Sequence, residues 1–324
     1  MKTAFSYGLS GIMLLALLVT PFTFAQLIPS MELDDSLQTD PVLTKIAYRN
    51  PAIESIPYDW AQRYPLIAHA LGGIGGYPGT NSLESLKRAY RSGLRVFETD
   101  IVVTSDGHLV LRHDWVAGSY PVLGQTVPKS QELGPMTLAK FKATKIQHRY
   151  TPVSFKELVR FMSAHPDVQL ITDTKEPDSF TAASIFKLIV RETSEVDPQV
   201  LRRIIPQLYR EDNFEAVSGV YPFKQYIYTL YMNNDSMDEV VDFASRNEIR
   251  VVVMDENKYT AEFVDALWKK GIYTYINTIN DVGQIKRYMN SGVQGVMTDF
   301  VIPADLRRDA SGYRQKTKIA GVPD

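Results

Sequence analysis

Two carboxylates and a histidine in one short stretch are the residues of this sequence best suited to chemistry. Glu98 and Asp100 lie two positions apart in RVFETDIVV, an expected strand, so both side chains should leave the same face. Asp106 and Gly107 follow as the signal of a tight hairpin turn. If these two residues form the loop, Asp100 pairs with His113, and their Cβ atoms lie roughly 4.5–5.5 Å apart.

A group of this kind suits a hard divalent cation beside a general acid or base, because Mg²⁺ and Ca²⁺ prefer carboxylate oxygens. The plainer alternative is an amphipathic edge hairpin whose charges face water. A third acid favours the metal interpretation, since Asp173 follows another expected strand, and Lys175 comes two positions later. If the chain stays extended there, Asp173 and Lys175 share a face.

The elements that must position these residues alternate between strand and helix, which predicts a parallel sheet. Strands are expected over 66–69, 95–103, 168–172, 203–208, 225–231, 249–254, 272–278 and 295–298. Helices are expected over 81–92, 154–165, 179–193, 213–218, 236–247, 260–270, 281–291 and 303–308. Eight units in about 240 residues predict an α/β fold, a single-domain (β/α)₈ TIM barrel with an insertion over 115–151, after the second strand. An open doubly wound sheet is the alternative, but the sequence contains no dinucleotide fingerprint.

Polar residues close or follow most of the expected strands. In a barrel these strand ends converge on one face, where enzymes of this fold carry their sites. The residues concerned are His69, Asp173, Lys175, Gln207, Tyr231, Asn277 and Asp299. One or two of them would be ordinary caps, but so many from separate segments indicate a site. The glycine-rich loop 72–79 permits close backbone approach to a ligand.

Composition and the chain ends narrow the function and its location. A net charge of −2 gives no basic field for nucleic acid, and the lack of cysteine excludes disulfides, thiol nucleophiles and thiolate metal sites. Lys2, an apolar core over 12–19 and a small-x-small end at Ala25 predict a signal peptide over 1–25 and export to the periplasm or medium. An uncleaved anchor is the alternative. An irregular arm over 26–64, the barrel over 65–310 and a tail over 311–324 should follow.

The sequence resembles the glycerophosphodiester phosphodiesterase family, within the wider phosphatidylinositol-phosphodiesterase-like barrels. The matching stretches are IAHALGG at 67–73, TNSLESLKRAYRSGLRVFETDIVVTSDGHLVLRHDW at 80–115, LITDTK at 170–175, PQLY at 206–209 and NTINDVGQIKRYMNSGVQGVMTDF at 277–300. The E-x-D, T-x-DG and HD elements in this order are specific, and together these stretches touch nearly the whole expected barrel.

The resemblance implies roles for these residues. His69 and His113 match the catalytic histidine pair, and Glu98 and Asp100 match two metal ligands. Asp173 stands where the family commonly has a glutamate ligand.

Five further residues are expected to contact the substrate. Lys175 matches a contact to substrate phosphate, and Asn81 matches the asparagine of the family's E-N-T element. Gln207, Tyr231 and Asn277 are expected to bind substrate from their strand ends.

The sequence also departs from the family pattern. Ala70 replaces the arginine of the usual His-Arg-Gly, the E-N-T element is here Thr80-Asn81-Ser82, and Asn277 stands where an aromatic residue is frequent. The Asp-x-Lys element also resembles sphingomyelinase D type lipases of spider venom.

The expected function is therefore a metal-dependent phosphoric diester hydrolase acting on glycerophosphodiesters or related phospholipid headgroups. One divalent cation, Mg²⁺ or Ca²⁺, and a His/His general acid-base pair would carry the reaction. The alternatives are a phospholipase D or sphingomyelinase D-like lipase, and a non-catalytic phosphodiester-binding barrel. The expected partner is a small-molecule or lipid-headgroup phosphodiester, and not nucleic acid. Transient contact with a membrane surface is compatible with this function, and no oligomeric state is indicated.

Overall fold

The computed structural model describes residues 57–129, 133–176 and 178–307. The chain divides into two units, Met1–Leu33 and Asp34–Asp324, and the first lies outside the described residues. The predicted signal peptide, most of the N-terminal arm and the C-terminal tail also lie outside them. None of the helices within the described ranges has both the length and the apolar character needed to span a bilayer.

A closed barrel of parallel strands forms the centre of the described fold, as the sequence predicts. The sheet has nine strands in the order β1-β9-β8-β7-β6-β5-β4-β2-β3, and pairing of β1 with β2 closes it. Only β3 is antiparallel, so eight parallel strands form the ring. The strands are β1 (Leu66–Ala68), β2 (Val96–Val103), β3 (Leu109–Leu111), β4 (Gln169–Asp173), β5 (Ile204–Leu208), β6 (Ile227–Thr229), β7 (Val251–Asp255), β8 (Tyr273–Asn277) and β9 (Gly295–Thr298).

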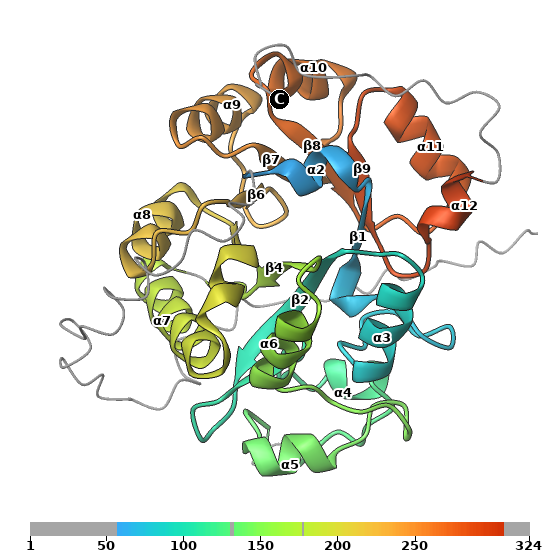
Figure 1. The fold of residues 1–324 in the computed structure, drawn as a ribbon, viewed down its shortest axis with the longest axis vertical. Helices are drawn as coiled ribbons and strands as arrows, with labels where there is room; N and C mark the ends of the chain where they lie inside the picture. Colours follow the sequence, from blue (N-terminus) through green and yellow to red (C-terminus); the bar gives the residue numbers. More distant parts are fainter. Residues whose placement is uncertain (1–56, 130–132, 177, 308–324) are drawn as a thin grey trace, which may run out of the picture. The chain divides into compact units, whose positions relative to one another are not determined.

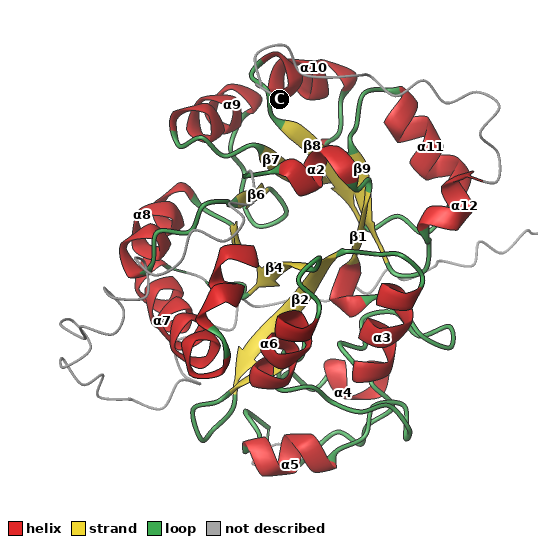
Figure 2. Cartoon of the chain, viewed as in Figure 1, coloured by secondary structure: helices red, strands yellow, loops and turns green. Residues whose placement is uncertain are grey.

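Helices surround these strands (Figures 1 and 2). They are α2 (Asp59–Arg63), α3 (Leu83–Arg91), α4 (Ser119–Val122), α5 (Leu138–Ala143), α6 (Phe155–Ala164), α7 (Ser179–Val196), α8 (Glu211–Val220), α9 (Met237–Arg246), α10 (Ala261–Lys269), α11 (Val282–Asn290) and α12 (Pro303–Arg307). Short 3₁₀ turns are η3 (His69–Leu71), η5 (Pro198–Arg203) and η6 (Glu256–Lys258). Local sequence starts several helices, and the capping box expected of Ser154 with Glu157 is present at α6.

Successive side chains of each strand point alternately into the barrel and toward the surrounding helices, so the apolar residues form two separate layers. The interior cluster consists of Ile67, Val96, Ile171, Ile205, Ile227, Val251, Val253, Tyr273, Tyr275 and Met297, joined by Tyr58, Trp60 and Ala61 at α2. Because successive side chains point to opposite faces, the next inward position along a strand lies two residues further on. These next positions are polar in most strands, so a polar layer lies above the apolar interior at the C-terminal strand ends.

Helix α2 packs at the opposite, N-terminal end of the barrel. Gln225, just before β6, accepts hydrogen bonds from Tyr58 N at 2.8 Å and Trp60 Nε1 at 2.7 Å. Gln294, just before β9, donates to Ala61 O at 2.7 Å. The prediction of an irregular arm up to residue 64 is therefore wrong for its last part, which is helical and packs into the barrel core.

The β2–β3 hairpin differs from the predicted register by one residue. Val103 pairs with Leu109, so the loop has three residues, 105–107, instead of two. Gly107 adopts a left-handed φ of 77°, and the Asp106 carboxylate accepts a bond from Leu138 N in the insertion. Three-residue loops ending in a left-handed residue are a common hairpin type, and here the contact with the insertion holds the loop. Arg112, and not His113, therefore stands opposite Asp100, to whose carbonyl its N–H donates at 3.1 Å.

Candidate active site

Three buried carboxylates meet at the C-terminal end of neighbouring strands β2 and β4. Asp100 and Asp173 are paired in the strand register, and one oxygen from each of Glu98, Asp100 and Asp173 lies within 4.8 Å of the others. Glu98 accepts a bond from Ala70 N at 2.8 Å through Oε2, whereas its Oε1 is buried without a hydrogen-bond partner. A buried acceptor without a donor, beside two further carboxylates, fits a divalent cation with oxygen ligands.

The pKa values of two of these carboxylates shift in opposite directions. Burial and the neighbouring charge of Asp100 raise the pKa of Glu98 above its usual range. Burial also opposes ionisation of Asp100, but the positive charge of Lys175 outweighs it and lowers the pKa of Asp100. The group therefore binds positive charge, and one protein cation already lies against it.

Lys175 is that cation. Strand β4 ends at Asp173 and Lys175 has a left-handed φ of 54°, so the expected extended continuation is wrong. Its long side chain nevertheless reaches the same place, with Nζ bonded to the Asp100 carboxylate and 2.7 Å from Asp173 Oδ2. Burial opposes the charge of Lys175, but the two aspartates outweigh it and hold its pKa well above the usual value. The ammonium thus stays charged beside the carboxylates.

His69 follows β1 and is held by the carboxylate of Asp299, the residue directly after β9, which is the next strand around the barrel. Its Nδ1 lies 2.9 Å from Asp299 Oδ1. Asn280 fixes that carboxylate by donating to Oδ2 at 2.8 Å and accepting from Asp299 N at 2.8 Å. Burial alone would lower the pKa of His69, but the bond to Asp299 and the charge of Glu98 raise it to about 9. With Nδ1 occupied, Nε2 is the ring nitrogen left for chemistry.

His113, two residues after β3, has a matching arrangement. Its Nδ1 lies 2.6 Å from Asp114 Oδ2, and Oδ1 of Asp114 accepts from Val116 N at 2.8 Å and from the Ser119 hydroxyl. The bond to Asp114 raises the pKa of His113 against the effect of burial, and the charge of Asp100 adds to it. Both histidines therefore present Nε2 and use Nδ1 for orientation.

The backbone is strained at the residues that place these groups. Ala70, Leu71, Asn81 and Lys175 all have φ between 46° and 64°, in the left-handed region that non-glycine residues avoid. Ala70 is the residue whose N–H bonds Glu98, and Lys175 carries the ammonium. Conformations of this cost persist where the surrounding structure holds them, and they cluster at functional sites.

The remaining predicted residues lie around the same end of the barrel. The amide of Asn81 donates to Asp100 Oδ2 at 2.8 Å and accepts from Thr99 at 2.6 Å, so it braces the carboxylate. Tyr231 Oη lies 3.3 Å from Asp173 Oδ1, although β6 ends two residues before it. Gln207 Oε1 and Asn277 Oδ1 are buried at the ends of β5 and β8 without hydrogen-bond partners.

Sequence reasoning left several residues of this site without a role. Asp299 was placed at a strand end but not with His69, and Asp114 was known only as part of the HD element. Tyr209, which donates to the Asp173 carboxylate and accepts from Thr174 N at 2.8 Å, could not be separated from simple packing. Asp255 is the last residue of β7. It was not considered because the expected strand ended one residue earlier, at Met254. Extending the inward positions by two residues along each strand finds Asp255 and Asp299.

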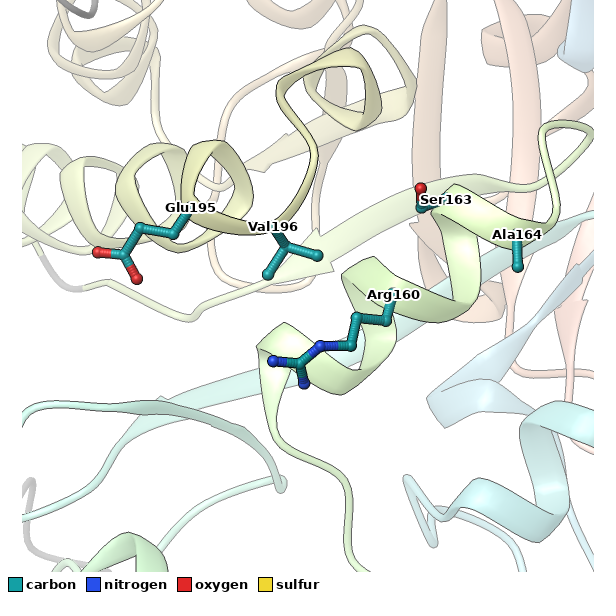
Figure 3. Close-up of a pocket in the computed structure, with 5 residues that line it drawn as sticks. All are labelled: Arg160, Ser163, Ala164, Glu195 and Val196. Carbon is teal, nitrogen blue, oxygen red and sulfur yellow. The ribbon is translucent and has the colours of Figure 1, made fainter.

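A surface pocket of about 450 Å³ lies away from these groups. It is lined by Arg160, Ser163 and Ala164 of α6 and by Glu195 and Val196 of α7 (Figure 3). None of these residues belongs to the strand ends, so the pocket is a groove between two outer helices.

Comparison with known proteins agrees with this geometry. Residues 71–302 match the model of the glycerophosphoryl diester phosphodiesterase family. A Silicibacter pomeroyi structure, provisionally named a glycerophosphoryl diester phosphodiesterase, superposes with a TM-score of 0.61 at 18% identity, covering 78% of this chain and 95% of that one. An Oleispira antarctica phosphodiesterase, solved with the product sn-glycerol-3-phosphate, gives 0.59 at 18% identity, covering 73% and 93%. A Parabacteroides distasonis glycerophosphodiester phosphodiesterase gives 0.58 at 17% identity, covering 72% and 92%.

At these identities the solved structures establish the fold, while the family match extends over most of the chain and includes nearly every site residue described above. Only His69 and Ala70 precede the matched range, by one or two residues. The chain therefore belongs to the glycerophosphoryl diester phosphodiesterase family and is a phosphoric diester hydrolase.

Proposed function

We propose that this chain hydrolyses glycerophosphodiesters or related phospholipid headgroups in a metal-dependent reaction with two histidines as general acid and base. One observation carries the proposal: His69 and His113, each oriented through Nδ1 by its own aspartate, lie at the barrel end that carries three buried carboxylates, and both interact with the charge of Asp100. This is the arrangement needed to move protons at both sides of a phosphodiester while its negative charge is balanced.

Glu98, Asp100 and Asp173 would hold the cation. Their donor set is all oxygen, which suits Mg²⁺ or Ca²⁺ better than zinc. When bound, a divalent cation supplies charge stabilisation to the phosphoryl oxygens. Tyr209 and Asn81 keep the two aspartates in place through their hydrogen bonds.

His69 and His113 would act as the general base and the general acid. One takes the proton of the attacking hydroxyl at Nε2, and the other gives a proton to the leaving alkoxide, so the proton count of the site is restored. The attacking hydroxyl is that of water or a neighbouring hydroxyl of the substrate, and the latter would give a cyclic phosphate first. Lys175 supplies further positive charge to the phosphate.

The substrate class draws support from the family match and from the sn-glycerol-3-phosphate bound to the Oleispira antarctica phosphodiesterase. The test is an assay of purified protein against soluble glycerophosphodiesters and lysophospholipids, with Mg²⁺, with Ca²⁺ and with a chelator. We expect turnover with at least one cation. Release of headgroup from lysophospholipid alone would indicate a lipase of the phospholipase D or sphingomyelinase D type. No turnover under any condition would favour a binding protein.

Lys175→Met should lower kcat/KM about 10–150-fold, because a charge-assisted bond to phosphate contributes about 1.5–3 kcal/mol. The methionine keeps most of the stem and removes the charge, which also leaves Asp100 and Asp173 without their ammonium partner. Thermal unfolding with chelator should therefore show a less stable protein, and metal should restore part of the loss.

Lys142→Met is the matched control, since Lys142 forms a part-buried ion pair with Glu157 of α6, which is not one of the three site carboxylates. Its steady-state kinetics should equal those of the parent. Parental kinetics in the Lys175→Met variant would instead mean that another residue serves the phosphate.

We also propose export, supported by the leader over residues 1–25. The intact mass of protein from the cell envelope or medium should correspond to a chain beginning at Gln26. A mass that includes Met1–Ala25 would indicate a retained anchor.

A further inference from the structure

Within the described residues, exposed large apolar side chains occur only in segments that follow β1, the β2–β3 hairpin, β4 or β6. They are Tyr77, Val116, Val122, Val127, Phe180 and Met232, with exposed fractions from 38% to 73%. Single exposed apolar residues are common on soluble proteins and need no explanation. Their distribution here does need one.

Three of the six follow the C-terminal end of a barrel strand, and the other three follow β3, which ends beside Asp100. Tyr77 lies between η3 and α3, and Met232 lies between β6 and α9. Phe180 is the second residue of α7, directly after the β4 connection. The three valines lie in the insertion between β3 and α6. The described connections at the N-terminal strand ends, and the outer faces of the helices beyond α7's first turn, expose none.

The insertion that carries the valines is also basic. Residues 115–151 contain five Lys or Arg (Lys129, Lys140, Lys142, Lys145 and Arg149) and one acid, Glu132, a net charge of +4. The whole chain has a net charge of −2, so the remainder carries −6. Exposed aliphatic groups and an excess of lysine together fit an anionic phospholipid surface.

The same insertion is joined to the candidate active site. It begins at Trp115, two residues after His113, and its Val116 N donates to Asp114, which orients that histidine. Further along, Leu123, Ile146 and Tyr150 pack with Ile74 of the loop that follows His69. The exposed side chains of Val116 and Val122, at 52% and 60%, thus project from an element anchored beside both histidines.

We propose that this end of the barrel docks on an anionic phospholipid surface, so that the site takes phosphodiesters still attached to a lipid. The inference rests on the proposed function for the identity of the reaction, but the docking itself does not require turnover. Apolar side chains would enter the headgroup boundary, and the insertion's lysines would lie over anionic headgroups.

The test is co-sedimentation with phosphatidylcholine vesicles, with and without about one third phosphatidylglycerol. Val122→Asp/Val127→Asp should bind the anionic vesicles at least about tenfold more weakly than the parent, because it removes two exposed apolar groups and adds two like charges. Lys140→Glu/Lys145→Glu, which changes two exposed lysines, should weaken binding similarly. Gln199→Glu/Ser245→Glu adds two exposed charges near the N-terminal strand ends and should bind as the parent does.

Any leader retained on the chain is common to all variants, so only differences between them are informative. Absence of binding by the parent, or equal binding by all four proteins, would overturn the proposal. Equal binding of the parent to neutral and anionic vesicles would overturn the choice of an anionic surface. The double valine variant should keep its kcat on a soluble glycerophosphodiester, which shows that it is folded, and lose turnover of vesicle-borne lysophospholipid.

The two proposals fail in different ways. Vesicle binding without turnover of any phosphodiester would contradict the proposed function and leave the docking surface intact. Normal turnover of soluble diesters without vesicle binding would remove the docking surface alone.

Discussion

His69→Ala and His113→Ala should each lower kcat about 10²–10⁴-fold on a soluble glycerophosphodiester, with KM changed by only a few fold. General acid-base catalysis contributes this range, and both histidines present Nε2 after their Nδ1 atoms are engaged by Asp299 and Asp114. Because the two act in one proton-transfer cycle, the double variant should be little slower than the worse single variant. Steady-state kinetics of the three variants would measure both effects.

His108→Ala is the matched control for these variants. His108 is 42% exposed on the β2–β3 hairpin and faces Glu192 at 3.9 Å, away from the three carboxylates. Its kcat should stay within about twofold of the parent, as is usual for a surface position outside the reaction. A decrease of less than tenfold in His69→Ala or His113→Ala, with KM unchanged, would contradict the acid-base assignment.

The sequence was sufficient to predict the barrel because the patterns that indicate its strands and helices are local and repeat along the chain. Apolar strands of similar length alternate with amphipathic helices whose caps, such as Ser154, are readable residue by residue. Placing Glu98, Asp100 and Asp173 together required only the two-residue period of a strand and the adjacency of neighbouring strands. Closure of the barrel could also have paired His69 with Asp299, since the first and last strands of a barrel are neighbours.

Other features depended on contacts that no local pattern contains. The hairpin register follows from a three-residue loop held by Asp106 against the insertion, whereas the Asp-Gly pair alone favours a two-residue loop. The approach of Lys175 to the carboxylates depends on a left-handed backbone that its residue type does not indicate. The role of Asn81 as a brace for Asp100 became visible only when both ends of its amide were found engaged.

Glu98→Gln should strongly weaken metal binding and, with it, activity. Loss of an outer contact to a metal ligand typically costs 10–100-fold in affinity, so loss of a direct ligand charge should cost more than about 100-fold. Glutamine matches the shape of Glu98 and can still accept the bond from Ala70 N, so the variant changes charge with little effect on packing. Calorimetric titration with Mg²⁺ and Ca²⁺ would measure the affinity independently of turnover.

Thermal unfolding provides a second test of this variant, because its stability relative to the parent should depend on whether metal is present. Without metal, Glu98 is a buried carboxylate beside Asp100 and Asp173, an arrangement that disfavours its ionised form, so Glu98→Gln should be at least as stable as the parent in chelator. With metal at 100 times its dissociation constant, the parent alone should gain about 2.7 kcal/mol. Glu176→Gln is the matched control, because Glu176 is equally buried but is not one of the three carboxylates, and it should keep the metal response. Full parental activity after exhaustive chelation, or a metal affinity of Glu98→Gln equal to that of the parent, would show that the three acids serve another purpose.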